Sequence, residues 1–153
     1  MTMHRLSIED FQEEPFKLVA IHCSHEAYQL CFLMNRHLDS HFERKSDHSI
    51  HGAHSCYEFF DWYDCKEQSH WRLVSNKCVA SAQQSYAGTL FETNATINYL
   101  VPEHKRVDYF LKFDDEVKGF KNRLSQVQQI PQIIAAYEIS TDQLKSKTNL
   151  IFD

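Results

Sequence analysis

The chain has 153 residues, of which 42% are hydrophobic and 13% are aromatic, and only three are glycine and three proline. This composition excludes a disordered or low-complexity chain and predicts one globular domain over residues 1–153, long enough to bury a core. The net charge of −5 and the lack of a basic stripe disfavour nucleic acid and anionic membranes as partners.

Residues 1–14 are polar and acidic, and we expect them to form an N-terminal arm. They lack the basic and apolar regions of a secretory signal peptide, and no apolar run approaches the length of a transmembrane helix. The five cysteines follow no regular spacing, which is typical of a reducing compartment and not of a disulfide framework. We therefore expect a cytoplasmic protein.

A nearly apolar strand is predicted over 16–23, followed by a helix over 25–38 that Ser24 is expected to cap. Beyond one apolar stripe at helical spacing, the helix carries three further apolar residues, Tyr28, Phe32 and Leu33. A helix that is apolar on more than one side is buried on more than one side. This surface is therefore predicted either to lie under a second layer or to contact a partner.

The next part of the chain alternates between short apolar runs and polar turns, including a His-rich loop over 46–55. Short strands are predicted over 41–45, 57–63, 71–74, 78–81 and 89–92. The strand over 57–63 has aromatic residues on both faces, with Phe60 and Trp62 on one of them. One of these two faces is a second candidate for a contact surface.

The stretch from 96 to 113 is the most regular in the sequence and the predicted centre of the sheet. The alternation over 107–113 predicts a half-buried strand, and residues 99–101 are also strand formers. Pro102 cannot donate to a sheet ladder, so residues 103–106 are expected at the tip of a hairpin, in a four-residue loop.

This stretch contains the residues Val101, Pro102, Glu103, Val107, Asp108 and Tyr109. Their pattern resembles the signature of the IPExxxVDY family of bacterial proteins, with Val101 in place of isoleucine. The resemblance implies a small cytoplasmic bacterial domain, and it implies no activity, substrate or catalytic residue. We favour a structural role, in which Glu103 and Asp108 tie the hairpin through Lys105, Arg106 or backbone N–H groups. The alternative is a direct catalytic role.

Asp114 is expected to cap a second helix whose apolar stripe runs from Val117 to Val127 and which Pro131 ends. Gly119 inside this helix would cost about 1 kcal/mol relative to alanine. A strand over 133–139 follows, and the apolar end over 150–152 is expected to dock on the domain.

This order of elements predicts an α+β fold. We expect a two-layer sandwich, with a mainly antiparallel sheet of about five to seven strands and two helices on one face.

Two sets of residues could carry chemistry. The histidines His48, His51 and His54 are spaced by three and could bind a transition metal, although no cysteine or carboxylate completes a ligand motif. Cys23 precedes the start of the first helix, where a thiol pKa can be lowered, and His25 lies near it.

No glycine-rich phosphate loop, G-x-S-x-G or HExxH motif is present, and no cofactor is indicated. We therefore expect a non-enzymatic domain that acts through protein–protein contact, as a homodimer or with another protein. The candidate interface residues are Tyr28, Phe32, Leu33, Phe60 and Trp62. The alternative is a small metal-dependent or Cys-based enzyme or binder that uses the His-rich loop 48–54 and the 22–26 junction.

Overall fold

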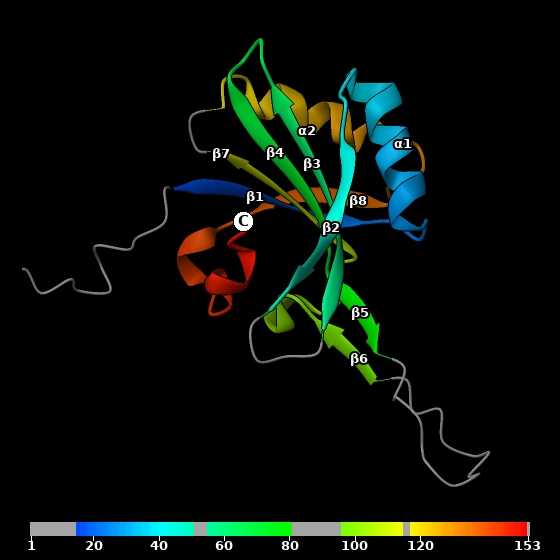
Figure 1. Ribbon diagram of the computed structural model, residues 1–153. Helices are drawn as coiled ribbons and strands as arrows, with labels where there is room; N and C mark the ends of the chain where they lie inside the picture. Colours follow the sequence, from blue (N-terminus) through cyan, green and yellow to red (C-terminus); the bar gives the residue numbers. More distant parts are fainter. Residues whose placement is uncertain (1–14, 51–54, 81–95, 115–116, 153) are drawn as a thin grey trace, which may run out of the picture.

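The computed structural model describes residues 15–50, 55–80, 96–114 and 117–152 (Figure 1). Its strands and helices, in chain order, are β1 (Phe16–His22), α1 (Ala27–Leu38), β2 (Glu43–Ser49), β3 (Cys56–Asp64), β4 (Ser69–Ser75), β5 (Lys77–Ala80), β6 (Thr96–Tyr99), β7 (Tyr109–Asp114), α2 (Phe120–Gln128) and β8 (Ala135–Ile139). Short 3-10 helices are η2 (Pro102–His104), η3 (Thr141–Gln143) and η4 (Lys147–Leu150). The predicted arm 1–14 and the predicted strand 89–92 lie outside the described residues.

Six of the strands form one antiparallel sheet in the order β2-β3-β4-β7-β1-β8, and β5 pairs with β6 in a separate two-stranded sheet. Helices α1 and α2 lie together on one face of the large sheet (Figure 1). The predicted α+β class, with a mainly antiparallel sheet and two helices on one face, is confirmed. β7 lies between β4 and β1 in the interior of the sheet, as expected from its regular pattern.

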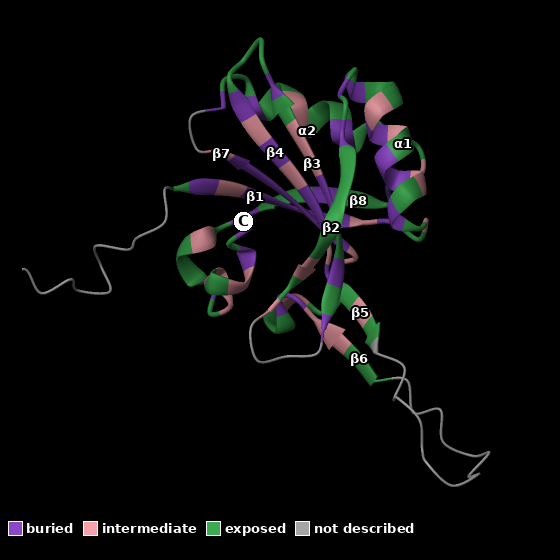
Figure 2. Cartoon of the chain, in the orientation of Figure 1, coloured by how far each residue is buried: buried purple, intermediate pink, exposed green. Residues whose placement is uncertain are grey.

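Apolar side chains cover both faces of the sheet, so there are two cores. Val19 and Trp71 pack under the two helices, while Leu18 and Phe110 pack on the opposite face. The C-terminal segment closes this second face with Leu150 and Phe152, so the predicted docking of the chain end is correct for these two side chains. Figure 2 shows the consequence: the central strands β1 and β7 are mostly buried, whereas the edge strand β2 is almost entirely exposed.

The predicted hairpin over 99–107 is wrong. β6 pairs with β5 in the small sheet, and β7 pairs with β4 and β1 in the large one. The chain between β6 and β7 contains the 3-10 helix η2, which starts at Pro102, where the missing N–H is tolerated. The two strand-like runs therefore belong to different sheets, because each finds its partner elsewhere in the chain.

β7 is also buried on both faces and not half-buried as predicted. The polar residue in its alternation, Lys112, is buried and extends its ammonium group to the carbonyl oxygen of Leu150, 2.8 Å away. The same group lies 4.5 Å from the ring centroid of Phe16. A lysine stem can pack as an apolar chain while its charged end finds polar atoms, so the sequence alternation did not indicate solvent exposure here.

Both helices begin later than predicted. Glu26, and not Ser24, is the N-cap of α1, and its backbone N–H donates to the side chain of Gln29. Gly119 is the N-cap of α2 and has a left-handed φ of 68°. It therefore lies outside the helix interior, and the loss of helix stability predicted for a glycine inside the helix does not apply. Asp114 does not cap this helix but ends β7 and accepts the backbone N–H of His70 at 2.8 Å.

The strand predicted over 41–45 is displaced along the chain. β2 begins at Glu43 and continues to Ser49, so residues 46–49 belong to a strand and not to the predicted loop. β2 is an edge strand and its side chains are exposed to solvent, so they can be polar or charged. Charged side chains on an edge strand also disfavour pairing with the strand of another molecule.

Candidate functional site

The signature residues surround one fully buried side chain, Asn76, between β4 and β5. Its amide nitrogen donates to the carbonyl oxygens of His104 and Val107, each at 2.8 Å, and its Oδ1 accepts the N–H of Val101 at 2.9 Å. Its backbone N–H also donates to the carbonyl oxygen of Asp108 at 3.0 Å. Asn76 therefore supplies the hydrogen bonds that the turn over 101–107 cannot make within itself. The sequence pattern indicated only a turn at this residue.

Glu103 connects this turn to the C-terminal segment. One of its carboxylate oxygens accepts the N–H groups of Lys145 at 2.7 Å and Ser146 at 2.9 Å, and the other accepts the Ser146 hydroxyl at 2.7 Å. Desolvation alone would raise the pKa of Glu103, but these hydrogen bonds and one from its own backbone outweigh it and lower the pKa to about 2. The ionised carboxylate of Glu103 thus holds the backbone at Lys145 and Ser146 in place, and we call this contact the Glu103 clamp.

Asp108 and Tyr109 connect the start of β7 to the junction between β1 and α1. Asp108 accepts the backbone N–H of Cys23 and the ammonium group of Lys77, both at 2.9 Å. The hydroxyl of Tyr109 donates to the carbonyl oxygen of His25 at 2.7 Å. The motif carboxylates therefore join distant segments. Both accept backbone N–H groups, which is one of the predicted kinds of partner, but neither pairs with the predicted Lys105 or Arg106.

The structure does not support Cys23 as a nucleophile. Its side chain is buried, with 2% of its surface exposed. Burial is the largest cause that raises the pKa of this thiol, Asp108 adds to it, and the hydrogen bond from the His25 backbone opposes it only in part. A buried, protonated thiol is the opposite of the activated one that the sequence position suggested.

The predicted histidine group is not brought together as a metal site by the described residues. His48 lies in β2, with its Nε2 2.7 Å from the carbonyl oxygen of Asn149 and its ring edge-on to Phe152. His51 and His54 lie outside the described residues. Over residues 15–50, 55–80, 96–114 and 117–152, no group of three or more His, Cys, Asp or Glu side chains is placed to hold a metal ion.

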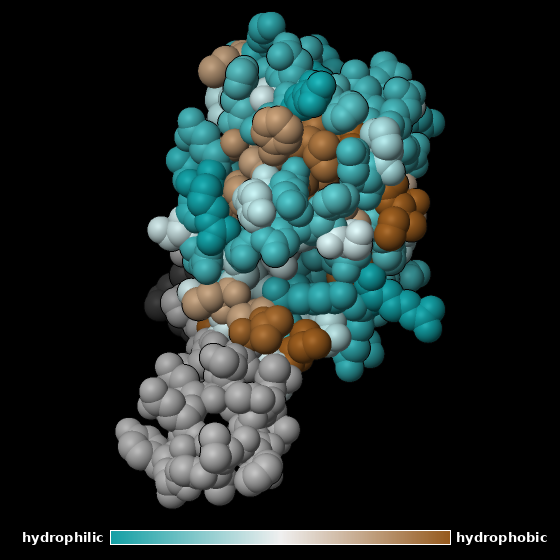
Figure 3. Space-filling view, turned by 90° about the vertical axis from the view of Figure 1, so that its right-hand side faces the viewer, coloured by the Kyte–Doolittle hydropathy of each residue, from teal (hydrophilic) through white to brown (hydrophobic). Residues whose placement is uncertain are grey.

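A groove of about 380 Å³ lies along α1, in the surface that the sequence singled out. Tyr28 and Phe32 line it and are each 62% exposed, while Leu33 is half-buried beside them. Figure 3, viewed from the side of α1, shows apolar side chains gathered here within a mostly hydrophilic surface. We call this surface the α1 groove; His25, Gln29 and Gln132 complete it.

The other two predicted interface residues are not part of this surface. Phe60 is buried in the core under the helices. Trp62 is half-buried and packs against Phe42 and Trp71, with ring centroids 5.7 and 5.1 Å away. The aromatic strand 57–63 therefore contributes mainly to the cores on both faces of the sheet and not to an exposed platform.

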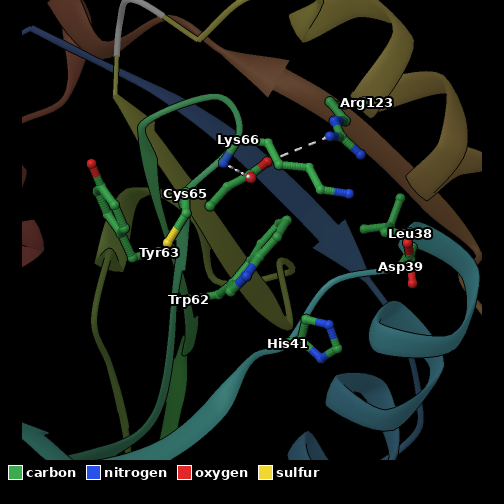
Figure 4. A pocket seen from close by; sticks show the side chains of 9 residues that line it. Leu38, Asp39, His41, Trp62, Tyr63, Cys65, Lys66 and Arg123 are labelled. Carbon is green, nitrogen blue, oxygen red and sulfur yellow. Dashed lines mark hydrogen bonds and ion pairs between the residues drawn. The ribbon is translucent and has the colours of Figure 1, made fainter.

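A second cavity, of about 300 Å³, lies where the end of α1 meets the β3–β4 turn and α2. In Figure 4, the ring of Trp62 lies between the side chains of His41 and Cys65. Asp64 is engaged by the N–H of Lys66 at 3.0 Å and by Arg123 at 3.6 Å. Asp64 and Arg123 thus pair with each other, and the mixture of acidic, basic and aromatic residues in the lining favours no class of ligand.

No protein-family model, curated protein or solved structure matches the chain. The resemblance of the 101–109 motif to the IPExxxVDY family stays a prediction. None of the described helices is both long and apolar enough to span a membrane.

Proposed function

We propose that this protein acts through protein–protein contact, and that the α1 groove binds the same groove of a second copy in a homodimer. The observation that carries this proposal is the exposure of Tyr28 and Phe32 along a groove whose other lining residues bear no carboxylate, lysine or arginine. Burying one such aromatic side chain contributes roughly 1.5 to 3 kcal/mol to the free energy of association. A two-fold contact buries Tyr28 and Phe32 of both copies. Aromatic residues in a desolvated centre are typical of interfaces.

The charges at the two ends of α1 favour a second copy as the occupant. Glu26 is exposed at the N-terminus of the helix, and Arg36 is exposed in its last turn. If two α1 helices pack antiparallel across a two-fold axis, Glu26 of each copy approaches Arg36 of the other. A parallel pairing would instead place like charges together and align the helix dipoles. The surface is thus complementary to itself in one orientation.

The test is the oligomeric state of the protein, measured by sedimentation velocity from about 1 to 100 µM, a range that covers ordinary dimer affinities. We expect a dimer for the natural sequence and a monomer for Phe32→Glu. Because Phe32 is exposed, the variant should keep the circular dichroism spectrum and melting temperature of the folded monomer. Val79→Glu is the matched control, since Val79 is an exposed apolar residue on β5 and should leave the dimer intact.

The charge pairing has its own test. Glu26→Arg and Arg36→Glu should each weaken the dimer, and the double variant should restore it, because the two charges are then exchanged. A natural protein that stays monomeric over the whole range refutes the proposal. Equal dissociation by Val79→Glu refutes the assignment of the contact to the α1 groove. No restoration in the double variant refutes the antiparallel arrangement.

A further inference from the structure

A third cavity, of about 550 Å³, lies beside the turn that contains η2 and reaches His22 at the end of β1 and Tyr137 in β8. It shares no lining residue with the α1 groove. Three consecutive basic residues, His104, Lys105 and Arg106, line it together with His22. A basic lining of this kind is notable in a chain whose net charge is −5.

The positive charges of this cavity are available to a ligand. Its one carboxylate, Glu103, already accepts hydrogen bonds from Lys145 and Ser146 on both oxygens. Neither Lys105 nor Arg106 has an ion-pair partner among the described residues. The ammonium group of Lys105 lies 5.7 Å from the ring centroid of Tyr99, a contact that leaves its hydrogen-bond donors free for an anion.

An aromatic wall forms the other side of the cavity. The rings of His22 and Tyr137 are stacked, with centroids 5.5 Å apart and an angle of 28° between their planes. The Nε2 atom of His22 lies 2.9 Å from the Tyr137 hydroxyl, which fixes the two rings relative to each other. The cavity therefore combines a flat ring surface with several donors for oxygen atoms.

We propose that this cavity binds a small organic molecule that carries a phosphate monoester. Arg106 can contact two phosphate oxygens at once, and Lys105 adds a compact positive charge. The His22–Tyr137 wall would take the organic part. The volume of about 550 Å³ lies within the range of small-molecule sites, about 300 to 1,000 Å³.

The test is calorimetric titration of the full chain with phenyl phosphate and with inorganic phosphate. We expect one site per chain for both, with tighter binding of phenyl phosphate. Arg106→Ser should weaken both ligands at least about tenfold, because an Arg–phosphate pair is a charge-assisted, two-point contact. Tyr137→Ala should remove the preference for phenyl phosphate and leave the binding of inorganic phosphate within about twofold. Lys121→Ser, an exposed position on α2, makes the same change in net charge and should alter neither affinity.

Absence of saturable binding up to about 10 mM phenyl phosphate, a value near the weak end of specific affinities, would overturn the proposal. So would equal weakening by Lys121→Ser, because general electrostatic attraction would then explain the data. Binding to vesicles that contain phosphatidic acid without binding of phenyl phosphate would assign the site to a lipid headgroup and reject a small molecule. The Phe32→Glu variant should bind phenyl phosphate like the natural protein, so this proposal and the dimer can fail separately.

Discussion

Replacing Asn76 by alanine should destabilise the protein far more than removal of an ordinary polar side chain. The side chain is fully buried and makes hydrogen bonds to the carbonyl oxygens of His104 and Val107 and to the N–H of Val101. Without it, the Val101 N–H and the Val107 carbonyl lose the hydrogen bonds that Asn76 gives them inside the core. The carbonyl of His104 keeps one bond, from the N–H of Val107 at 3.2 Å.

Each buried polar group without a partner costs about 1 to 3 kcal/mol. The Val101 N–H and the Val107 carbonyl are two such groups, and the His104 carbonyl loses one of its two hydrogen bonds. Together they give an expected loss of about 3 to 5 kcal/mol in the free energy of unfolding for Asn76→Ala. This is a large share of the roughly 5 to 15 kcal/mol that stabilises a domain. Asn98→Ala is the matched control: this half-buried amide donates one bond, to the Ser55 hydroxyl, and should cost about 1 kcal/mol.

The free energy of unfolding is measured by urea titration at pH 7, with two probes to establish two-state behaviour. Asn76→Asp separates hydrogen bonding from packing, because it keeps the shape but replaces the donor with an oxygen that faces two carbonyls. We expect it to be at least as destabilising as Asn76→Ala. A cost below about 1 kcal/mol for Asn76→Ala, or near-natural stability for Asn76→Asp, would refute the reasoning.

Acid should destabilise the natural protein partly through Glu103. Its folded pKa of about 2 lies below its ordinary 4.5, so its contribution is complete above about pH 4.5 and is lost as the pH falls toward 2. In urea titrations across that range, Glu103→Gln should lack this part of the pH dependence, and an unchanged profile would contradict the clamp. Burial raises the pKa of Cys23 and raises that of Cys31 to about 11, so Ellman's reagent should modify them only after unfolding; fast reaction of folded Cys23 would contradict its burial. Leu150→Ala should cost about 2 to 5 kcal/mol in urea titration, as for other buried leucines, whereas exposed Ile151→Ala should cost under about 0.5 kcal/mol. Equal effects would show that the chain end is not docked.

Much of the candidate interface could be predicted because helical periodicity is local. The apolar residues of α1 outnumber those that one buried stripe can hold, and Tyr28 and Phe32 are the ones left on the surface. The same reasoning was wrong for Phe60. A strand with aromatic residues on both faces can be covered on both, and the sequence of the strand does not contain the elements that cover it.

The position of Cys23 before a helix suggested activation, but solvent access depends on segments that pack over the residue from elsewhere in the chain. The motif carboxylates show the same limit, because Glu103 contacts Lys145 and Ser146, and Asp108 contacts Cys23 and Lys77. The local sequence pattern carries no information about partners that lie so far away in the chain.

Hydrophobic period and turn chemistry were thus enough for the α+β class, the main strands and the existence of both helices, since these depend on neighbours within a few residues. Long-range pairing decided the rest. It placed β6 and β7 in different sheets, enclosed Lys112, made Asn76 the centre of the motif and brought His22 and Tyr137 to the basic turn. The sequence of each segment taken alone is compatible with several pairing partners. The native partners are those that let the apolar side chains on both faces of the sheet be buried at the same time.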